Sequence, residues 1–274
     1  SESFFWPVLN YRIAGQLLGS GYSKEQRVDI GRVHPEFRID RFTRHDGTVR
    51  FFNYVHAILG CDAGSLQVLE FGAGRGSFYH DGRSEYRKRL QDLRSSGAVV
   101  TAADIDPVVE THPCSDRQVV IEAGKPLPFD DESFDVIVSD FTFEHLPDPE
   151  QVAAELLRVL KPGGWICART VNKWGYVAMV SRLVPNALHA RLLGRIQPQR
   201  SEADVFPTVY RLNTPAAARR HFRGHEVIWY HDNGDPSYHF GNGLLYRLLL
   251  LGHRLLPARL ATSICFFVRK SSRV

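Results

Sequence analysis

The residues with the clearest chemical character form a tight glycine turn directly after an apolar run. Val68-Leu69 leads into Glu70-Phe71-Gly72-Ala73-Gly74-Arg75-Gly76. Glycine tolerates positive φ and lets a ligand approach the backbone closely, and the amide groups that open a following helix favour the polar groups of that ligand. The pattern therefore predicts a strand, turn and helix that bind a cofactor.

The spacing of the glycines separates classes of ligand. A dinucleotide site requires G-x-G-x-x-G, but Ser77 stands where its third glycine would be, and Gly76 comes one residue early. A phosphate-binding P-loop needs Gly-Lys followed by Ser or Thr, which the turn lacks. A ribose would be held by an acidic residue at the end of the second strand, and Asp104 follows the run Val99–Ala103 at that place.

Apolar, β-rich runs alternate with helical segments along the chain, which is typical of a parallel sheet covered on both faces. We predict an α/β fold, doubly wound and Rossmann-like, with a mostly parallel seven-stranded sheet, an antiparallel last strand and helical cap elements. The predicted strands are Ser65–Phe71, Ala98–Ala103, Gln118–Ile121, Phe134–Ser139, Gly164–Thr170, Glu226–Tyr230 and Ala261–Arg269. The predicted helices are Thr48–Leu59, Ser84–Arg94, Pro149–Leu160, Trp174–Gly194 and one that Asn213 starts with Thr214-Pro215 at its head.

Four segments follow from this alternation. We expect an N-terminal cap over 1–62, a cofactor-binding core over 63–170 and a helical cap insertion over 171–222. Residues 223–274 would close the sheet, with an amphipathic helix between their two strands.

The order of several short motifs between Gln67 and Thr170 resembles the class I methyltransferases that depend on S-adenosylmethionine, especially the small-molecule group called type 11. Each motif is weak alone, and their order and spacing carry the resemblance. They are the E-x-G-x-G-x-G turn, Asp104-Ile105-Asp106-Pro107, Leu127-Pro128-Phe129, Ser133-Phe134-Asp135-Val136-Ile137, Glu144-His145-Leu146-Pro147-Asp148 and Leu157-Arg158-Val159-Leu160-Lys161-Pro162-Gly163-Gly164.

The resemblance implies a cofactor site built around the glycine turn. Gly72, Ala73 and Gly74 would lie along the methionine part of S-adenosylmethionine, with Glu70 and Gly76 completing the turn.

The other implied contacts come from the ends of later strands. Asp104 would hold the ribose, Ile105 would pack on the adenine, and Gly124-Lys125 would lie at the adenine edge. Asp140-Phe141 would face the methionine end and the substrate. One departure is Ala123, which stands where many members place an aspartate for the adenine amino group, so adenine must be recognised by backbone or another side chain.

Methyl transfer to a hydroxyl needs positioning and the removal of a proton. His145 is the first candidate for the base because it follows the fourth strand closely and an imidazole can act as a base near neutral pH. Tyr210 and His80 are the second and third candidates. Each also fits a structural role. His145 would pack against the start of the next helix, Tyr210 would belong to the aromatic segment before a helix, and His80 would lie in a surface loop.

We therefore expect O-methylation of a small-molecule, glycan or lipid-linked substrate. N- or carboxyl-methylation, a dinucleotide-binding oxidoreductase and a non-catalytic cofactor-binding module remain alternatives. The Glu144-His145 pair resembles that of quinone-precursor O-methyltransferases with a metal site, but Phe141 stands where those enzymes have a further glutamate. Gly224 interrupts the helix that would align His221 with His225 as metal ligands, so no metal is predicted. Nucleic-acid methyltransferases that act on amino groups carry an Asn/Asp-Pro-Pro-Tyr run after the fourth strand. This chain has Asp140-Phe141-Thr142-Phe143 there instead, which argues against that class.

Charge is unevenly distributed along the chain. Residues 1–150 hold 16 Lys and Arg against 24 Asp and Glu, whereas residues 151–274 hold 18 against 6. A basic surface could attract an anionic substrate, an anionic membrane or nucleic acid, or could simply be a solvated surface. The scattered cysteines and the absence of a signal-peptide pattern lead us to expect a cytoplasmic protein.

The leucine-rich segment 244–256 carries Arg247 and Arg254 seven residues apart. A basic amphipathic helix of this kind can lie in a membrane interface, which would make contact with the membrane peripheral. The same pattern also fits a helix that packs on the sheet or forms a dimer contact.

Overall fold

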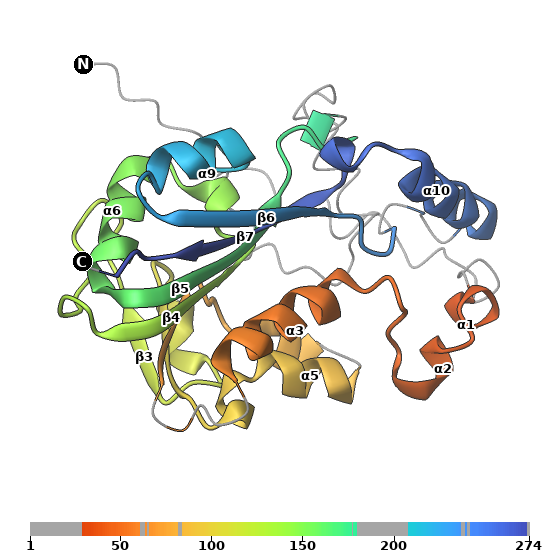
Figure 1. Cartoon of the computed structure of the whole chain (residues 1–274). Coiled ribbons are helices and arrows are strands. Elements are labelled where there is room, and N and C mark those ends of the chain that lie inside the picture. Colours follow the sequence, from red (N-terminus) through yellow and green to blue (C-terminus); the bar gives the residue numbers. More distant parts are fainter. Residues whose placement is uncertain are drawn as a thin grey trace, which may run out of the picture.

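The computed structural model describes residues 29–60, 64, 66–81, 84–176, 178, 179, 208–236, 239 and 242–272. Within them lies one seven-stranded sheet in the order β3-β2-β1-β4-β5-β7-β6 (Figure 1). Its strands are β1 (Gln67–Phe71), β2 (Val99–Asp104), β3 (Arg117–Val120), β4 (Phe134–Asp140), β5 (Leu160–Val171), β6 (Glu226–Asp232) and β7 (Ser263–Arg269).

The strand directions confirm the predicted fold class. The pairs among β1 to β5 are parallel, and β7 runs antiparallel to both of its neighbours, β5 and β6. The chain passes outward from β1 through β2 to β3 and then returns to β4 on the other side of β1. In open α/β sheets, ligands bind beyond the carboxyl ends of the strands at such a reversal.

One face of the sheet is covered by α3 (Gly47–Leu59) and α5 (Glu85–Gln91) (Figure 1). The 3-10 turn η2 (Leu93–Ser96) contacts α3 and β2. Asp46 starts α3 by accepting hydrogen bonds from the backbone N–H groups of Thr48 and Val49, at 2.9 and 3.0 Å. Phe51 and Val55 lie one turn apart and are fully buried against the sheet, which stabilises the fold by about 1.5–3 kcal/mol for each side chain.

The opposite face carries α6 (Pro149–Val159) and α9 (Pro215–His221) (Figure 1). Leu156 and Phe222 belong to the core that these two helices share with the sheet. Asp148 caps α6 by accepting from the backbone of Gln151, at 3.1 Å. The cap of α9 is Thr214 rather than the predicted Asn213, whose side chain belongs to a buried network described below.

The remaining described helices lie beside the sheet. They are α1 (Ile30–Val33), α2 (Phe37–Asp40), α4 (Ser77–Asp81), α10 (Gly243–Leu255) and the 3-10 turns η3 (Pro107–Thr111), η4 (Phe143–His145) and η6 (Ala258–Leu260). The predicted helix from Trp174 to Gly194 falls mostly outside the described residues. The described part of the chain contains no helix with the length and apolar character that a membrane crossing requires.

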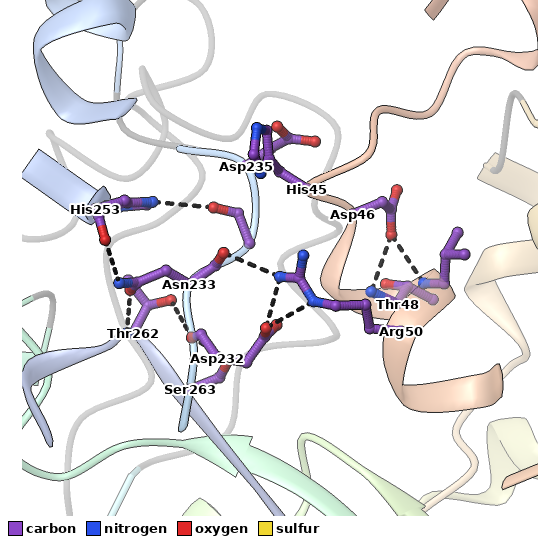
Figure 2. A network of polar contacts seen from close by, with 12 residues as sticks. His45, Asp46, Thr48, Arg50, Asp232, Asn233, Asp235, His253, Thr262 and Ser263 are labelled. Carbon is purple, nitrogen blue, oxygen red and sulfur yellow. Dashed lines mark hydrogen bonds and ion pairs between the residues drawn. The ribbon is translucent and has the colours of Figure 1, made fainter. Parts of the chain in front are cut away.

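The N-terminal end of α3 is bound to the loop that follows β6 (Figure 2). Arg50 donates from Nε to the Asp232 carboxylate at 2.9 Å and from Nη2 to the carbonyl of Asn233 at 3.0 Å. Asp232 is 5% exposed, so this ion pair is shielded from water on the carboxylate side. The contact joins residues 182 positions apart and holds α3 against the carboxyl end of β6.

Candidate active site

The glycine turn connects β1 to α4 at the carboxyl edge of the sheet. Gly72, Gly74 and Gly76 have positive φ, at 76°, 56° and 65°. A Cβ on Gly72 would lie 2.2 Å from Oγ1 of Thr142, and one on Gly76 would lie 2.8 Å from Cδ of Pro113. A Cβ on Gly74 would meet no described atom within 4 Å. Packing therefore requires glycine at the two outer positions, whereas Gly74 borders open space.

Asp104 lies directly beside this turn, as the sequence predicts. Its carboxylate accepts hydrogen bonds from the backbone N–H groups of Gly74, at 2.8 Å, and Asp106, at 2.9 Å. The side chain of the next residue, Ile105, is 48% exposed although it is large and apolar. The fixed carboxylate of Asp104 and the exposed apolar side chain of Ile105 therefore lie next to each other at the end of β2, beside the glycine turn.

Glu70 is a buried carboxyl group at the start of the turn. Burial raises its pKa to about 8, and burial lowers the pKa of neighbouring His112 to about 4, with Arg94 adding to the effect on His112. The 3.6 Å separation between Oε2 of Glu70 and Nε2 of His112 therefore joins two neutral groups at neutral pH and is not an ion pair. Among the described residues, Oε2 of Glu70 has no hydrogen-bond partner.

The end of β4 is held by a buried guanidinium. Arg169 of β5 donates from Nε and Nη2 to the two oxygens of Asp140, at 2.7 and 2.6 Å, and from Nη1 to the hydroxyl of Thr48 at 3.1 Å. Its Cζ lies 4.7 Å from the ring centroid of Phe141 and 5.4 Å from that of Phe51. The charge is thus paired, hydrogen-bonded and placed against two aromatic rings, as a buried charge must be.

Phe141 follows this ion pair with an unusual backbone. Its φ is 56°, a left-handed conformation that costs a bulky residue on the order of 1–3 kcal/mol. The hydrogen bond from its N–H to the carbonyl of Arg169, at 2.7 Å, and the ring contact with the guanidinium hold it there. As a result, 42% of the Phe141 side chain is exposed just beyond the carboxyl end of β4.

A second buried network lies behind η4. Thr170 donates to Oε2 of Glu144 at 2.6 Å and accepts from Nδ2 of Asn213, also at 2.6 Å. Burial raises the pKa of Glu144, against the effect of the Thr170 hydrogen bond. The backbone N–H groups of Val209 and Tyr210 donate to the carbonyl of Glu144, at 2.8 and 3.2 Å.

This network brings two of the three predicted base candidates into one region. His145 is half-buried and follows Glu144 directly, and Tyr210, with a φ of 50°, lies against the Glu144 carbonyl. The third candidate, His80, is exposed on α4 beside Tyr79.

The predicted adenine-edge residues occupy an exposed turn after β3. The carbonyl of Gly124 accepts from the side chain of Gln151 on α6 at 2.9 Å, and Lys125 pairs with Glu122. Among the described residues there is no group of three His, Cys, Asp or Glu side chains placed to hold a metal ion.

Arg169, Thr170 and Asn213 were not predicted from the sequence. The signal that could have identified Arg169 and Thr170 is their polarity. They directly follow the apolar run Ile166-Cys167-Ala168 within a central strand, where buried apolar residues are expected. Asn213 resembles a helix cap in the sequence, and only its contact with Thr170 reveals its other role.

The comparison with family models identifies a methyltransferase domain over residues 69–168, which includes the glycine turn, Asp104, Asp140 and η4. The core of the chain belongs to the class I methyltransferases. This family takes its methyl group from S-adenosylmethionine, and the residues at the carboxyl edge fit that cofactor: Gly74 borders open space, Asp104 is a fixed carboxylate, and Glu70 has a buried oxygen without a described partner.

Named relatives match part of the chain. A phthiotriol/phenolphthiotriol dimycocerosates methyltransferase of Mycobacterium tuberculosis is 34% identical over 104 residues, which cover 38% of this chain and 37% of that protein. Methyltransferase str2 of Strobilurus tenacellus is 30% identical over 124 residues, covering 44% and 41%. The chain thus spans less than half of the length of these relatives. A solved S-adenosylmethionine-dependent methyltransferase from Archaeoglobus fulgidus is 15% identical, with a TM-score of 0.49, covering 81% of this chain and 92% of that one.

Proposed function

We propose that this protein is a methyltransferase that transfers the methyl group of S-adenosylmethionine to a hydroxyl group of a small-molecule, glycan or lipid-linked acceptor. The observation that carries the proposal is the open space beside Gly74, bordered by the fixed carboxylate of Asp104. The dimycocerosate methyltransferase named above supports an acceptor of the small-molecule or lipid-linked kind.

In this proposal the cofactor contributes a methyl group made electrophilic by a sulfonium. Gly72, Ala73 and Gly74 line its methionine part with backbone, which the positive φ values of the two glycines permit. Asp104 binds the ribose hydroxyls. Its two present hydrogen bonds, from Gly74 and Asp106, fix the carboxylate before any ligand arrives, so little ordering is needed on binding.

The remaining contacts come from the ends of β2, β3 and β4. The exposed side chain of Ile105 packs on the adenine, and Gly124 and Lys125 lie at its edge. Asp140 and Phe141 face the acceptor, and the ion pair with Arg169 keeps both in place.

His145 is the proposed base that accepts the hydroxyl proton as the oxygen attacks. It follows the fourth strand at the carboxyl edge of the sheet, where ligands of open α/β sheets bind, and an imidazole can accept a proton near neutral pH. The buried hydrogen bonds between Glu144, Thr170 and Asn213 hold the η4 turn on which His145 lies. Tyr210 and His80 are the alternatives.

We further propose that residues 1–62 and 171–222 are caps on a core at 63–170, with 223–274 closing the sheet; of the two caps, 1–28 and 180–207 lie outside the described residues. Two contacts support this division. Thr48 of the first cap binds Arg169 at the end of the core, and Asn213 of the second binds Thr170. The two caps are therefore bonded to adjacent residues of β5, the first to Arg169 and the second to Thr170.

Calorimetric titration with S-adenosylhomocysteine, S-adenosylmethionine and NAD tests the cofactor assignment. We expect one site per chain for the first two ligands. Gly74→Ala should weaken both by roughly tenfold or more, because its methyl group would occupy the space that borders the ligand.

Gly224→Ala is the matched control, since Gly224 also has a positive φ, 86°, and no described atom within 4 Å of its Cβ position. Both variants should fold, as judged by circular dichroism. Tighter binding of NAD would replace the assignment with a dinucleotide enzyme. If the wild-type protein binds none of the three ligands, the proposal fails.

A further inference from the structure

Helix α10 presents a row of leucines to the outside. Leu244, Leu248, Leu251 and Leu255 follow one another at intervals of four, three and four residues, which places them on one face of the helix. Their exposed fractions are 70%, 55%, 52% and 75%. We call these four side chains the leucine ridge. Its exposure shows that this face of α10 does not pack on the sheet.

The opposite face of α10 is bound to the protein by polar groups. Tyr246 is 1% exposed and directs its hydroxyl to Asp235 at 3.4 Å. Nδ1 of His253 lies 3.0 Å from the carbonyl of Gly234, and its Nε2 lies 2.7 Å from the hydroxyl of Tyr176 (Figure 2 shows the first contact). In a surface helix of a soluble protein the apolar stripe normally faces the core. Here Leu245, Leu249 and Leu250 are partly buried, but the leucine ridge is an additional apolar face that points outward, and the polar contacts fix that orientation.

The charged side chains that α10 itself carries have one sign. Arg247 and Arg254 are exposed, and their positions in the helix place both along the same side of the ridge. The sequence from residue 236 to residue 274 contains six Lys and Arg and no Asp or Glu. An apolar ridge flanked by cations is complementary to a surface that is anionic outside and apolar beneath.

The position of α10 relates it to the candidate active site. The helix lies in the connection from Asp232, which ends β6, to Ser263, which starts β7. Ser263 pairs with Val171 at the carboxyl end of β5, next to the end of β4 where Asp140 and Phe141 lie. The leucine ridge therefore belongs to the same edge of the sheet as the glycine turn, and α10 lies beyond that edge in Figure 1.

We propose that α10 docks on an anionic lipid bilayer, with the leucine ridge in the interface and Arg247 and Arg254 on the lipid headgroups. Docking would turn the carboxyl edge of the sheet toward the membrane. If the proposed function holds, the acceptor then reaches the site from the membrane, which selects the lipid-linked acceptor among the three classes. The docking itself depends on neither the cofactor nor catalysis.

Flotation of the purified chain with vesicles, without cofactor, tests the docking. The vesicles are phosphatidylcholine alone, or phosphatidylcholine and phosphatidylglycerol at roughly three to one. We expect binding to the anionic vesicles that weakens as salt is added, because the headgroup attraction is screened. Leu248→Gln/Leu251→Gln should weaken it by roughly tenfold or more, and Arg247→Gln/Arg254→Gln by roughly fivefold for each charge.

Two controls match these variants in chemistry but lie elsewhere. Ile228→Gln removes an apolar side chain that is 46% exposed on β6, and Arg220→Gln/Arg223→Gln removes two exposed arginines at the end of α9. Both should bind vesicles as the wild type does. The proposal is overturned if the wild type does not float, if the leucine variant floats equally well, or if that variant only converts a dimer to a monomer, in which case a second copy covers the ridge. Gly74→Ala should float normally, so loss of cofactor binding and loss of docking are separable results.

Discussion

Replacing Glu70 by glutamine should change how the stability of the protein depends on pH. Burial raises the pKa of Glu70 from 4.5 to about 8, so the folded protein holds this proton more tightly than the unfolded chain does. A group of this kind contributes stability that is fully present below pH 4.5 and is lost as the pH rises through 8. Glutamine has no proton to lose, so Glu70→Gln should escape that loss.

The size of the effect follows from the two pKa values. At about 1.4 kcal/mol for each pH unit between them, the wild type should lose about 4 kcal/mol of unfolding free energy between pH 5 and pH 9 through this group alone. His112, whose pKa is lowered to about 4, acts in the opposite sense, because its contribution is present above 6.5 and is lost as the pH falls. Since His112 is present in both proteins, the difference between them isolates Glu70.

Urea unfolding at pH 5, 7 and 9 measures this difference. The stability of Glu70→Gln relative to wild type should rise steadily with pH, whereas Glu226→Gln, at an exposed position, should track the wild type at every pH. A constant difference between Glu70→Gln and wild type would refute the reasoning, because it would mean that Glu70 is already ionised in the folded state or is not buried. Binding of the cationic cofactor should favour the ionised carboxylate and so release a proton, which calorimetry in two buffers detects, and the variant should not release it.

Two further outcomes concern the acceptor side of the site. His145→Ala should lower the single-turnover rate by roughly a hundredfold or more, with cofactor affinity within a few fold of wild type; a rising limb near neutral pH that survives the substitution would move the role to Tyr210 or His80. Arg169→Met should lower the free energy of unfolding by about 3 kcal/mol, since Asp140 loses its partner but keeps some contact with water. Asp140→Asn should restore part of that loss in the double variant, and equal stability of Arg169→Met and wild type would contradict the buried ion pair.

Much of the fold could be predicted because its signals are local. Strand and helix positions follow from apolar periodicity, and Asp46 and Asp148 cap their helices within three residues along the chain. The predicted single helix over Ser84–Arg94 is instead broken at Asp92, whose side chain caps the following 3-10 turn. β5 begins at Leu160, four residues before the prediction, because an irregularity in its pairing with β4 accommodates Pro162 and the glycines after it.

In the candidate site, too, the residues with a local sequence signal could be predicted and those held by distant contacts could not. The glycine turn and Asp104 carry a spacing that sequence alone reveals, and the structure places them in contact. The fork from Arg169 to Asp140 joins residues 29 positions apart, and its bond to Thr48 spans 121. No local pattern encodes these partners, because they meet only after the sheet has formed and α3 has packed on it.

The place of β7 in the sheet constrains how the chain can fold. β7 is inserted between β5 and β6, although it follows both of them along the chain. Until residues 263–269 arrive, β5 is an open edge and β6 has no described strand to pair with. During synthesis, the backbone N–H and C=O groups of β5 and β6 that pair with β7 therefore stay unpaired until residues 263–269 have left the ribosome. Unpaired edges of this kind promote association between chains, so release of β7 should mark the point at which the nascent protein becomes resistant to aggregation.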